Sequence, residues 1–328
     1  MSRGFDGFEI DDFRDSRFDS GRDVSRSSSS DWSARTSLPK IHREEARADQ
    51  LDREGRQRSR GERMLLPREE RVQTILSQRT RTQYGDRGKD YSLRDSEIHT
   101  LSELGKFRIV VADDLAELAY NGDRTRMEHD VESLVRQGLA KTTSIADADH
   151  NPIQAVTLSK EGHKLLSRGK VLRPDQVTYY GLKKPKEAMH DAHLYRLYHK
   201  VADEIEEGGG WVLRVKLDYE IKRELYARLA HFSDDKGHIP EAVKEEVARH
   251  HHLKVMSGEI PIPDLSVEYV NEGAIQRCDL ELVTDHYRPQ GLAQKARAGF
   301  HIYARREEAD RLRRIRDEWE LTAAILSF

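Results

Sequence analysis

Three carboxylates in the C-terminal third of the chain, Asp264, Asp279 and Glu281, are the residues best suited to do chemistry. They lie on two β-prone runs, 262–269 and 275–284, which a polar turn separates. Because side chains alternate along a strand, Asp279 and Glu281 share one face of the second run. Asp264 and Glu281 converge if the register of this hairpin permits. Such a pair offers hard oxygen ligands to Mg²⁺, an ion that polarises a phosphodiester and generates hydroxide.

The two runs resemble the PD-(D/E)xK nuclease superfamily. Pro263-Asp264 corresponds to the first half of the motif, and the run from Asp279 to Val283 corresponds to the second. Val283 stands where the superfamily has lysine, but some members supply the lysine from the following helix, where this chain has Lys295. The resemblance implies a Mg²⁺-dependent endodeoxyribonuclease. Its catalytic residues are then Asp264, Glu281 and Lys295. Its metal ligands are then Asp264, Asp279 and Glu281.

Two other interpretations of these carboxylates stay open. They could keep a strand edge soluble or form salt bridges with Arg277, Arg288 and Lys295. Alternatively, the domain keeps a nuclease fold only to bind DNA. We expect His190 and His193, three apart on a helix, to lie on a solvated face, and we expect Cys278 to be a buried small hydrophobe.

A second group of residues suits contacts with double-stranded DNA. A helix predicted over 124–137 has the width of the major groove, and its N-terminal residues can meet base edges. The predicted contacts on this helix are Arg124, Thr125, Arg126 and His129. The predicted phosphate contacts on the strand that follows are Lys141, Thr142 and Thr143. Because Glu128, Asp130 and Glu132 lie among these residues, two alternatives are a solvated helix face and a surface that binds protein.

The elements around this helix follow a recognisable order. Apolar spacing and turn residues predict helix, short strand, helix, turn, helix, hairpin and helix between Ser96 and about residue 170. The runs Asp123–Leu139 and Thr157–Gly162 resemble bacterial winged helix-turn-helix DNA-binding domains. The resemblance implies that the helix at 124–137 reads DNA and that the hairpin braces it.

The predicted fold class is α+β, with a winged helix-turn-helix domain followed by a restriction-endonuclease-like α/β domain. Elements of the second domain are predicted as a long helix from Glu187, a strand, two helices, the carboxylate hairpin and a final helix over about 305–326. The predicted boundaries are a disordered tail over 1–90, the winged helix over 91–170, a linker over 171–185 and the nuclease-like domain over 186–328. Only nine of the first 60 residues are Ile, Leu, Val or Phe, too few to offset the entropy of ordering the tail. A basic helix over 62–83 is expected at its end.

Composition excludes several classes of protein. The chain has 328 residues, 56 Lys+Arg and 59 Asp+Glu, hence a formal net charge of −3. A single cysteine excludes an intramolecular disulfide and a cysteine-based zinc site. No apolar run is long enough for a transmembrane helix, and the N-terminus has no secretory signal. We therefore expect a cytoplasmic protein that does not bind membranes.

A winged helix followed by a degenerate nuclease-like domain, over about residues 90–328, resembles the replication-relaxation family of mobile elements and plasmids. The resemblance implies a DNA-binding accessory factor in replication or mobilisation, with no certain cofactor and with Mg²⁺ only if the nuclease site is active. An active nuclease is the first alternative. An adaptor that recruits a relaxase or replication protein is the second, and the last helix could form a homodimer.

Overall fold

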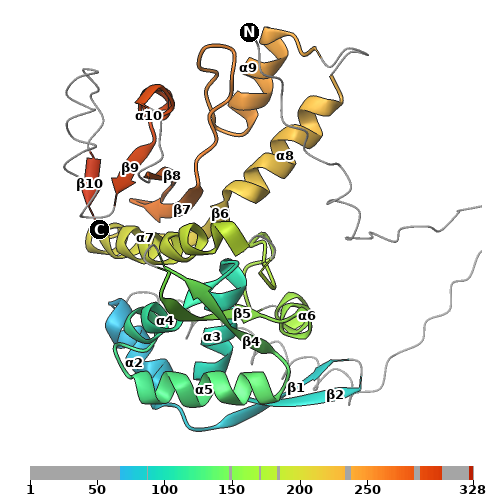
Figure 1. The fold of residues 1–328 in the computed structure, drawn as a ribbon, viewed down its shortest axis with the longest axis vertical. Helices are drawn as coiled ribbons and strands as arrows, with labels where there is room; N and C mark the ends of the chain where they lie inside the picture. Colours follow the sequence, from blue (N-terminus) through green and yellow to red (C-terminus); the bar gives the residue numbers. More distant parts are fainter. Residues whose placement is uncertain are drawn as a thin grey trace, which may run out of the picture. The chain divides into compact units, whose positions relative to one another are not determined.

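A computed structural model describes residues 67–86, 88–147, 150–169, 171–182, 185–232, 238–283, 289–304 and 325–327. All belong to one compact unit, which extends from Arg58 to Phe328. The fold mixes α-helices with β-sheets, as the sequence predicts (Figure 1). Every helix in these ranges is too short or too polar to cross a membrane. The tail over residues 1–66 lies outside the described residues.

The N-terminal elements form a helical core with a small antiparallel sheet. These elements are α3 (Asp95–Lys106), β3 (Val110–Val111), α4 (Ala112–Ala119), α5 (Arg124–Arg136), β4 (Ala140–Ala146), β5 (Pro152–Leu158) and α6 (Lys160–Gly169). The strand order is β3-β5-β4. Leu104, Leu115 and Leu134 are fully buried, because apolar residues at helical spacing form one stripe on each helix. The order of these elements is the one that the sequence predicts for this region.

Helical and strand structure begins earlier than the expected boundary at residue 91. Helix α2 (Arg68–Ser77) and a hairpin of β1 (Arg81–Asp86) and β2 (Lys89–Arg94) precede the core. The helix expected over 62–83 therefore ends at Ser77. On β2, Tyr91 and Leu93 are buried, and this alternation of only two apolar residues among charges is too short to predict a strand.

The C-terminal elements are built around a five-stranded sheet (Figure 1). They are α7 (Ala188–Glu207), β6 (Trp211–Leu217), α8 (Asp218–Ala230), α9 (Glu241–His250), β7 (Leu265–Asn271), β8 (Ala274–Val283), α10 (Pro289–Ala298), β9 (His301–Ala304) and β10 (Ile325–Ser327). The strands lie side by side in chain order. Strand β7 is antiparallel to β6 and β8, whereas β8, β9 and β10 run parallel.

The two faces of this sheet pack against different elements. Val215, Leu265 and Leu280 on one face share an apolar cluster with α7 and with the N-terminal elements. Val283 and Ile302 on the other face belong to a cluster with α8, α9 and α10. The carboxylates at the hairpin face the second side, since they alternate with residues of the first cluster.

Helix α7 joins the two predicted domains. Phe107 packs edge-on against Tyr195, with ring centroids 5.1 Å apart. Four ion pairs and one hydrogen bond also connect α7 to the N-terminal elements. The ion pairs are Arg108–Asp191, Arg196–Asp114, Arg68–Asp203 and Arg71–Glu206, and the hydrogen bond is His199–Glu103. The N-terminal and C-terminal elements therefore share one core within the described residues.

The segment predicted as a linker, 171–185, is packed rather than free where it is described. The side-chain amide of Gln176 donates to Val215 O at 2.8 Å and accepts from Val215 N at 3.0 Å. This amide thus satisfies the N–H and C=O of Val215 at the free edge of β6, where unpaired backbone groups invite pairing with another chain. The segment also contacts α3, because Tyr179 N donates a hydrogen bond to Gly105 O. Glycine is needed at position 105, since a Cβ there would lie 2.7 Å from the side chain of Leu166.

The prediction of a final helix over about 305–326 is wrong at its C-terminal end. Residues Ile325–Ser327 form β10, which pairs in parallel with β9. Both the β-prone Ile325-Leu326 pair and the free edge of β9 favour a strand here. Residues 305–324 lie outside the described residues, so the homodimer surface expected there stays a prediction.

Candidate functional site

The carboxylate hairpin brings Asp264 and Glu281 together where β7 begins and β8 ends, at the strand ends that we call the sheet edge. The register pairs Ser266 with Asp279 and Leu265 with Leu280, so the next position along the ladder sets Asp264 opposite Glu281. The backbone N–H of Leu282 donates to Asp264 Oδ2 at 2.9 Å. Neighbouring strands thus carry the two acids at the same level.

Lys295 reaches the same edge from α10. Its ammonium group forms an ion pair with Glu281 Oε1. The side chain of Glu281 is only 1% exposed, and that of Lys295 is 19% exposed. The helix that follows the hairpin therefore places a lysine ammonium group beside a buried carboxylate.

His190, at the start of α7, also contacts this edge, instead of lying on a solvated face. Its Nε2 lies 3.5 Å from Asp264 Oδ1. Burial disfavours the imidazolium, but the hydrogen bond and charge of Asp264 outweigh burial, so the pKa of His190 is raised. Burial likewise opposes ionisation of Asp264, yet His190 and Lys295 together lower the pKa of this carboxyl.

Arg108, from the N-terminal elements, holds the two helices next to Asp264. Its guanidinium lies 3.2 Å from Asp191 Oδ2 on α7 and 3.3 Å from Asp218 Oδ1 at the start of α8. The N–H of Asp218 donates to Asp264 O at 2.8 Å. Both helix starts that flank Asp264 are thus tied to one arginine, whose side chain is 12% exposed.

Asp279 does not join Asp264 and Glu281 in a metal-binding cluster. Arg277 lies on the same strand face and donates to Asp279 Oδ1 at 2.7 Å, and Ser266 donates to the same oxygen. Across the residues that the structure describes, no group of three or more His, Cys, Asp or Glu side chains is placed to hold a metal ion. The three-carboxylate ligand set expected from the sequence is therefore not formed.

Two carboxylates nevertheless fit Mg²⁺. This ion keeps several waters and binds proteins through one or two carboxylates. Asp264 and Glu281 offer such oxygens, and the lowered pKa of Asp264 keeps its carboxyl ionised at neutral pH. The donor set suits a hard divalent cation better than a transition metal that prefers nitrogen or sulfur.

The basic residues at the start of α5 are paired with acids. Asp123 caps the helix by accepting from Arg126 N at 3.0 Å. Arg124 lies 2.7 Å from Asp113 and 2.9 Å from Glu128. Arg126 turns toward the fully buried Asp130, at 3.4 Å. The predicted DNA contacts Arg124 and Arg126 are thus neutralised, whereas Thr125 and His129 are exposed beside them.

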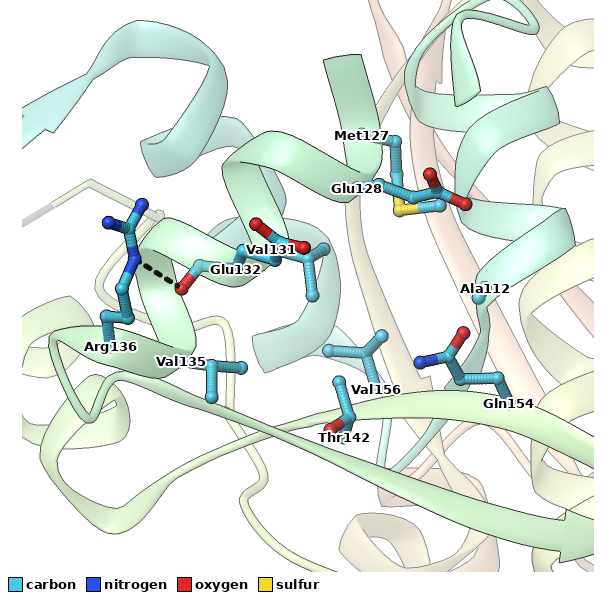
Figure 2. A pocket seen from close by; sticks show the side chains of 10 residues that line it. All are labelled: Ala112, Met127, Glu128, Val131, Glu132, Val135, Arg136, Thr142, Gln154 and Val156. Atoms are coloured by element: carbon cyan, nitrogen blue, oxygen red, sulfur yellow. Dashed lines mark hydrogen bonds between the residues drawn. The ribbon is translucent and has the colours of Figure 1, made fainter. Parts of the chain in front are cut away.

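The hairpin residues predicted to contact phosphates do not share one face. Thr142 lies opposite Val156, and both face α5 (Figure 2). Lys141 and Thr143 alternate with Thr142 and so point to the other side. On that side Ile145 and Ala155 pack with Ala192 of α7. Part of the hairpin is therefore covered by the C-terminal elements.

A groove lies between α5 and the hairpin. Its volume is about 500 Å³. It is lined by Ala112, Met127, Glu128, Val131, Glu132, Val135, Arg136, Thr142, Gln154 and Val156 (Figure 2). Apolar side chains from α5 and β5 form its floor, and two carboxylates stand on α5 at its side.

Sequence reasoning missed Arg108, His190 and the groove. Arg108 stands in a β-prone run far from Asp191 and Asp218 along the chain, so spacing gives no sign of their contact. The adjacent His190 and Asp191 are only a weak sign of a functional site, namely an acid and a base next to each other at the start of a helix. The sequence does hint at the groove, since Glu128 and Glu132 lie next to Val131 and Val135 on the predicted helix and mix acidic with apolar side chains on one surface.

Comparisons with known proteins show no family for this chain. No protein-family model matches it, and no curated protein matches it. One solved structure, described as that of the restriction endonuclease FokI, is similar over 71% of this chain and 68% of its own, at 9% identity and a TM-score of 0.20. A likeness this weak adds nothing to the geometry above.

Proposed function

We propose that this chain is a Mg²⁺-dependent DNA nuclease whose active site is the sheet edge formed by Asp264, Glu281 and Lys295. The observation that carries the proposal is the position of Lys295, which reaches Glu281 from α10 although the motif position holds Val283. The order of the described strands supports a restriction-endonuclease-like fold, since β6 to β10 lie in chain order and β7 alone among them is antiparallel to the others.

Each residue has a part in this proposal. Asp264 and Glu281 would hold Mg²⁺, which supplies Lewis-acid stabilisation of charge on the phosphate. Lys295 orients the attacking water and stabilises negative charge that develops on the phosphoryl oxygens. His190 keeps Asp264 ionised and oriented, since its raised pKa favours the cation beside that carboxylate.

Cleavage of supercoiled and linear duplex DNA in Mg²⁺ or Mn²⁺ tests the proposal. We expect Asp264→Asn, Glu281→Gln and Lys295→Met each to lower the cleavage rate by about 10²–10⁴-fold, as for loss of a positioned acid–base or charge-stabilising group. Glu272→Gln at the exposed β7–β8 turn is the matched control and should cleave normally. Cleavage that persists in Asp264→Asn, or its absence from the wild type, would overturn the assignment.

DNA binding without cleavage is the second candidate, and the order of the N-terminal elements favours it. In that case α5 reads duplex DNA through the predicted residues, and the C-terminal fold only supports binding. A gel-shift titration in graded salt tests this candidate, since each lost phosphate contact lowers the salt slope by about one unit. Binding that is unchanged in Arg124→Ala/Arg126→Ala would remove α5 as the reader. The replication-relaxation, mobile-element and relaxase-adaptor roles stay predictions, because no family model matches.

A further inference from the structure

We propose that the groove between α5 and the β4–β5 hairpin binds a peptide segment of a partner protein that carries an apolar side chain flanked by arginine or lysine. The groove lies on the N-terminal elements, away from the carboxylate edge of the large sheet. The proposal does not depend on nuclease activity.

The floor of the groove calls for an apolar ligand. Met127 and Val131 on α5 and Val156 on β5 line the hollow (Figure 2), but they are 2%, 6% and 1% exposed and so offer a ligand little accessible surface. Val135, at the same wall, is 37% exposed and belongs to the few large apolar side chains that the described part of the chain leaves open to solvent. Covering this side chain removes apolar surface from water, which is the main source of binding free energy at such sites.

The wall of the groove calls for a cation. Glu128 and Glu132 are exposed and stand one turn apart on α5. Like charges at this spacing repel each other, and Arg124 and Arg136, each four residues from one of the two acids, offset part of that repulsion. A cation of the ligand between the two acids would offset more of it. Glu128 pairs with Arg124, and both side chains of this pair are more than half exposed. Such a pair contributes little and is easily exchanged for a cation of the partner.

The same carboxylates disfavour a nucleic acid in this groove. A phosphate placed over Thr142 would approach Glu128 and Glu132, and Arg136 is the basic residue of the lining that could offset them. The Nε of Arg136 donates to Glu132 O at 3.5 Å, so this side chain lies along the helix. Opposite signs of charge therefore favour a basic peptide over a polyanion.

Peptide display against the full-length chain tests the proposal. Phage-displayed random 12-residue peptides are selected on the wild type, and the enriched sequences are synthesised and titrated by fluorescence anisotropy. We expect sequences that combine an aliphatic or aromatic residue with Arg or Lys. Glu128→Arg/Glu132→Arg should weaken their binding by about tenfold or more, and Val135→Ser should weaken it several-fold. Glu245→Arg/Glu246→Arg on the exposed face of α9 carries the same change of charge and should have no effect.

A 20-base-pair duplex, titrated into the same proteins at matched salt, separates the peptide from DNA. Reversal of Glu128 and Glu132 should weaken the peptide without weakening the duplex, since the two ligands have opposite charge. The proposal is overturned if no peptide is enriched, if enriched peptides are acidic, if the reversed variant binds them as well as the wild type, or if the duplex displaces them.

Discussion

The outer face of α5 and the edge of the large sheet both carry basic side chains beside carboxylates, but in different surroundings. At α5, Arg124 and its partners Asp113 and Glu128 are each more than half exposed. At the sheet edge, Glu281 is 1% exposed, and Arg108 and Asp191 are 12% and 7% exposed. Water and salt screen the first set strongly and the second much less. The same residue types therefore form an adaptable surface at α5 and a fixed, chemically tuned site at the sheet edge.

Arg108→Met should have the largest effect on stability of the changes that probe this difference. The variant leaves Asp191 and Asp218 without their shared cation, and breaking a buried pair from one side costs about 3–5 kcal/mol. Because Asp218 is partly exposed, we expect the lower end of that range. Urea unfolding followed by circular dichroism at pH 7 measures the loss.

Arg173→Met is the matched control for this variant. Arg173 also binds one carboxylate, Asp175, through two hydrogen bonds, but both side chains are more than 40% exposed. Its removal should change the free energy of unfolding by less than about 1 kcal/mol. If Arg108→Met and Arg173→Met lower the free energy of unfolding equally, burial does not distinguish the buried ion pairs from the exposed one.

Sequence patterns predict the elements far better than the partners of the charged residues. The start of α5 is visible because Asp123 is a good N-cap, and the hairpin is visible because Asp264 and Glu281 sit on alternating runs. The burial of Asp130 within a run of charged residues has no local sign, since it depends on Arg94, Tyr120 and Arg126 closing over it. The capture of Asp279 by Arg277 depends on which rotamers the sheet face allows. Register sets which residues meet, but competition among nearby charges decides which of them pair.

Glu220 offers a sharper test of how burial changes a charged group, because nearby cations only weakly offset the burial of its carboxyl. Its side chain lies on α8 and is 1% exposed, and its Oε2 has no hydrogen-bond partner among the residues that the structure describes. Burial raises the pKa of Glu220 to about 7, against a smaller opposite effect of Lys216. A carboxyl whose folded pKa exceeds its unfolded value of about 4.5 stabilises the fold at low pH, and this contribution is lost as the pH rises from about 4.5 to 7.

Glu220→Gln should therefore gain stability relative to the wild type above pH 7 and should match it near pH 4. The gain at pH 8 is roughly 2 kcal/mol, less than the full shift implies because water relaxes around the carboxyl. Urea unfolding from pH 4 to 8 gives the profile. Glu245→Gln, on the exposed face of α9, should follow the wild type at every pH. A wild-type profile that does not fall relative to Glu220→Gln between pH 5 and 7 would contradict an elevated pKa.

Arg124→Ala should have the smallest effect on stability and the most informative effect on binding. Because the guanidinium and both its partners are exposed to solvent, we expect no measurable shift of the urea midpoint. Removing Arg124 frees Glu128, so a basic peptide selected on the groove should bind about twofold more tightly, whereas duplex DNA read by α5 should bind less tightly. Anisotropy titrations of both ligands in 50 and 200 mM salt distinguish these outcomes. A loss of stability as large as that of Arg108→Met would show instead that the α5 ion pairs fix the helix in place, and the contrast between the two regions would not hold.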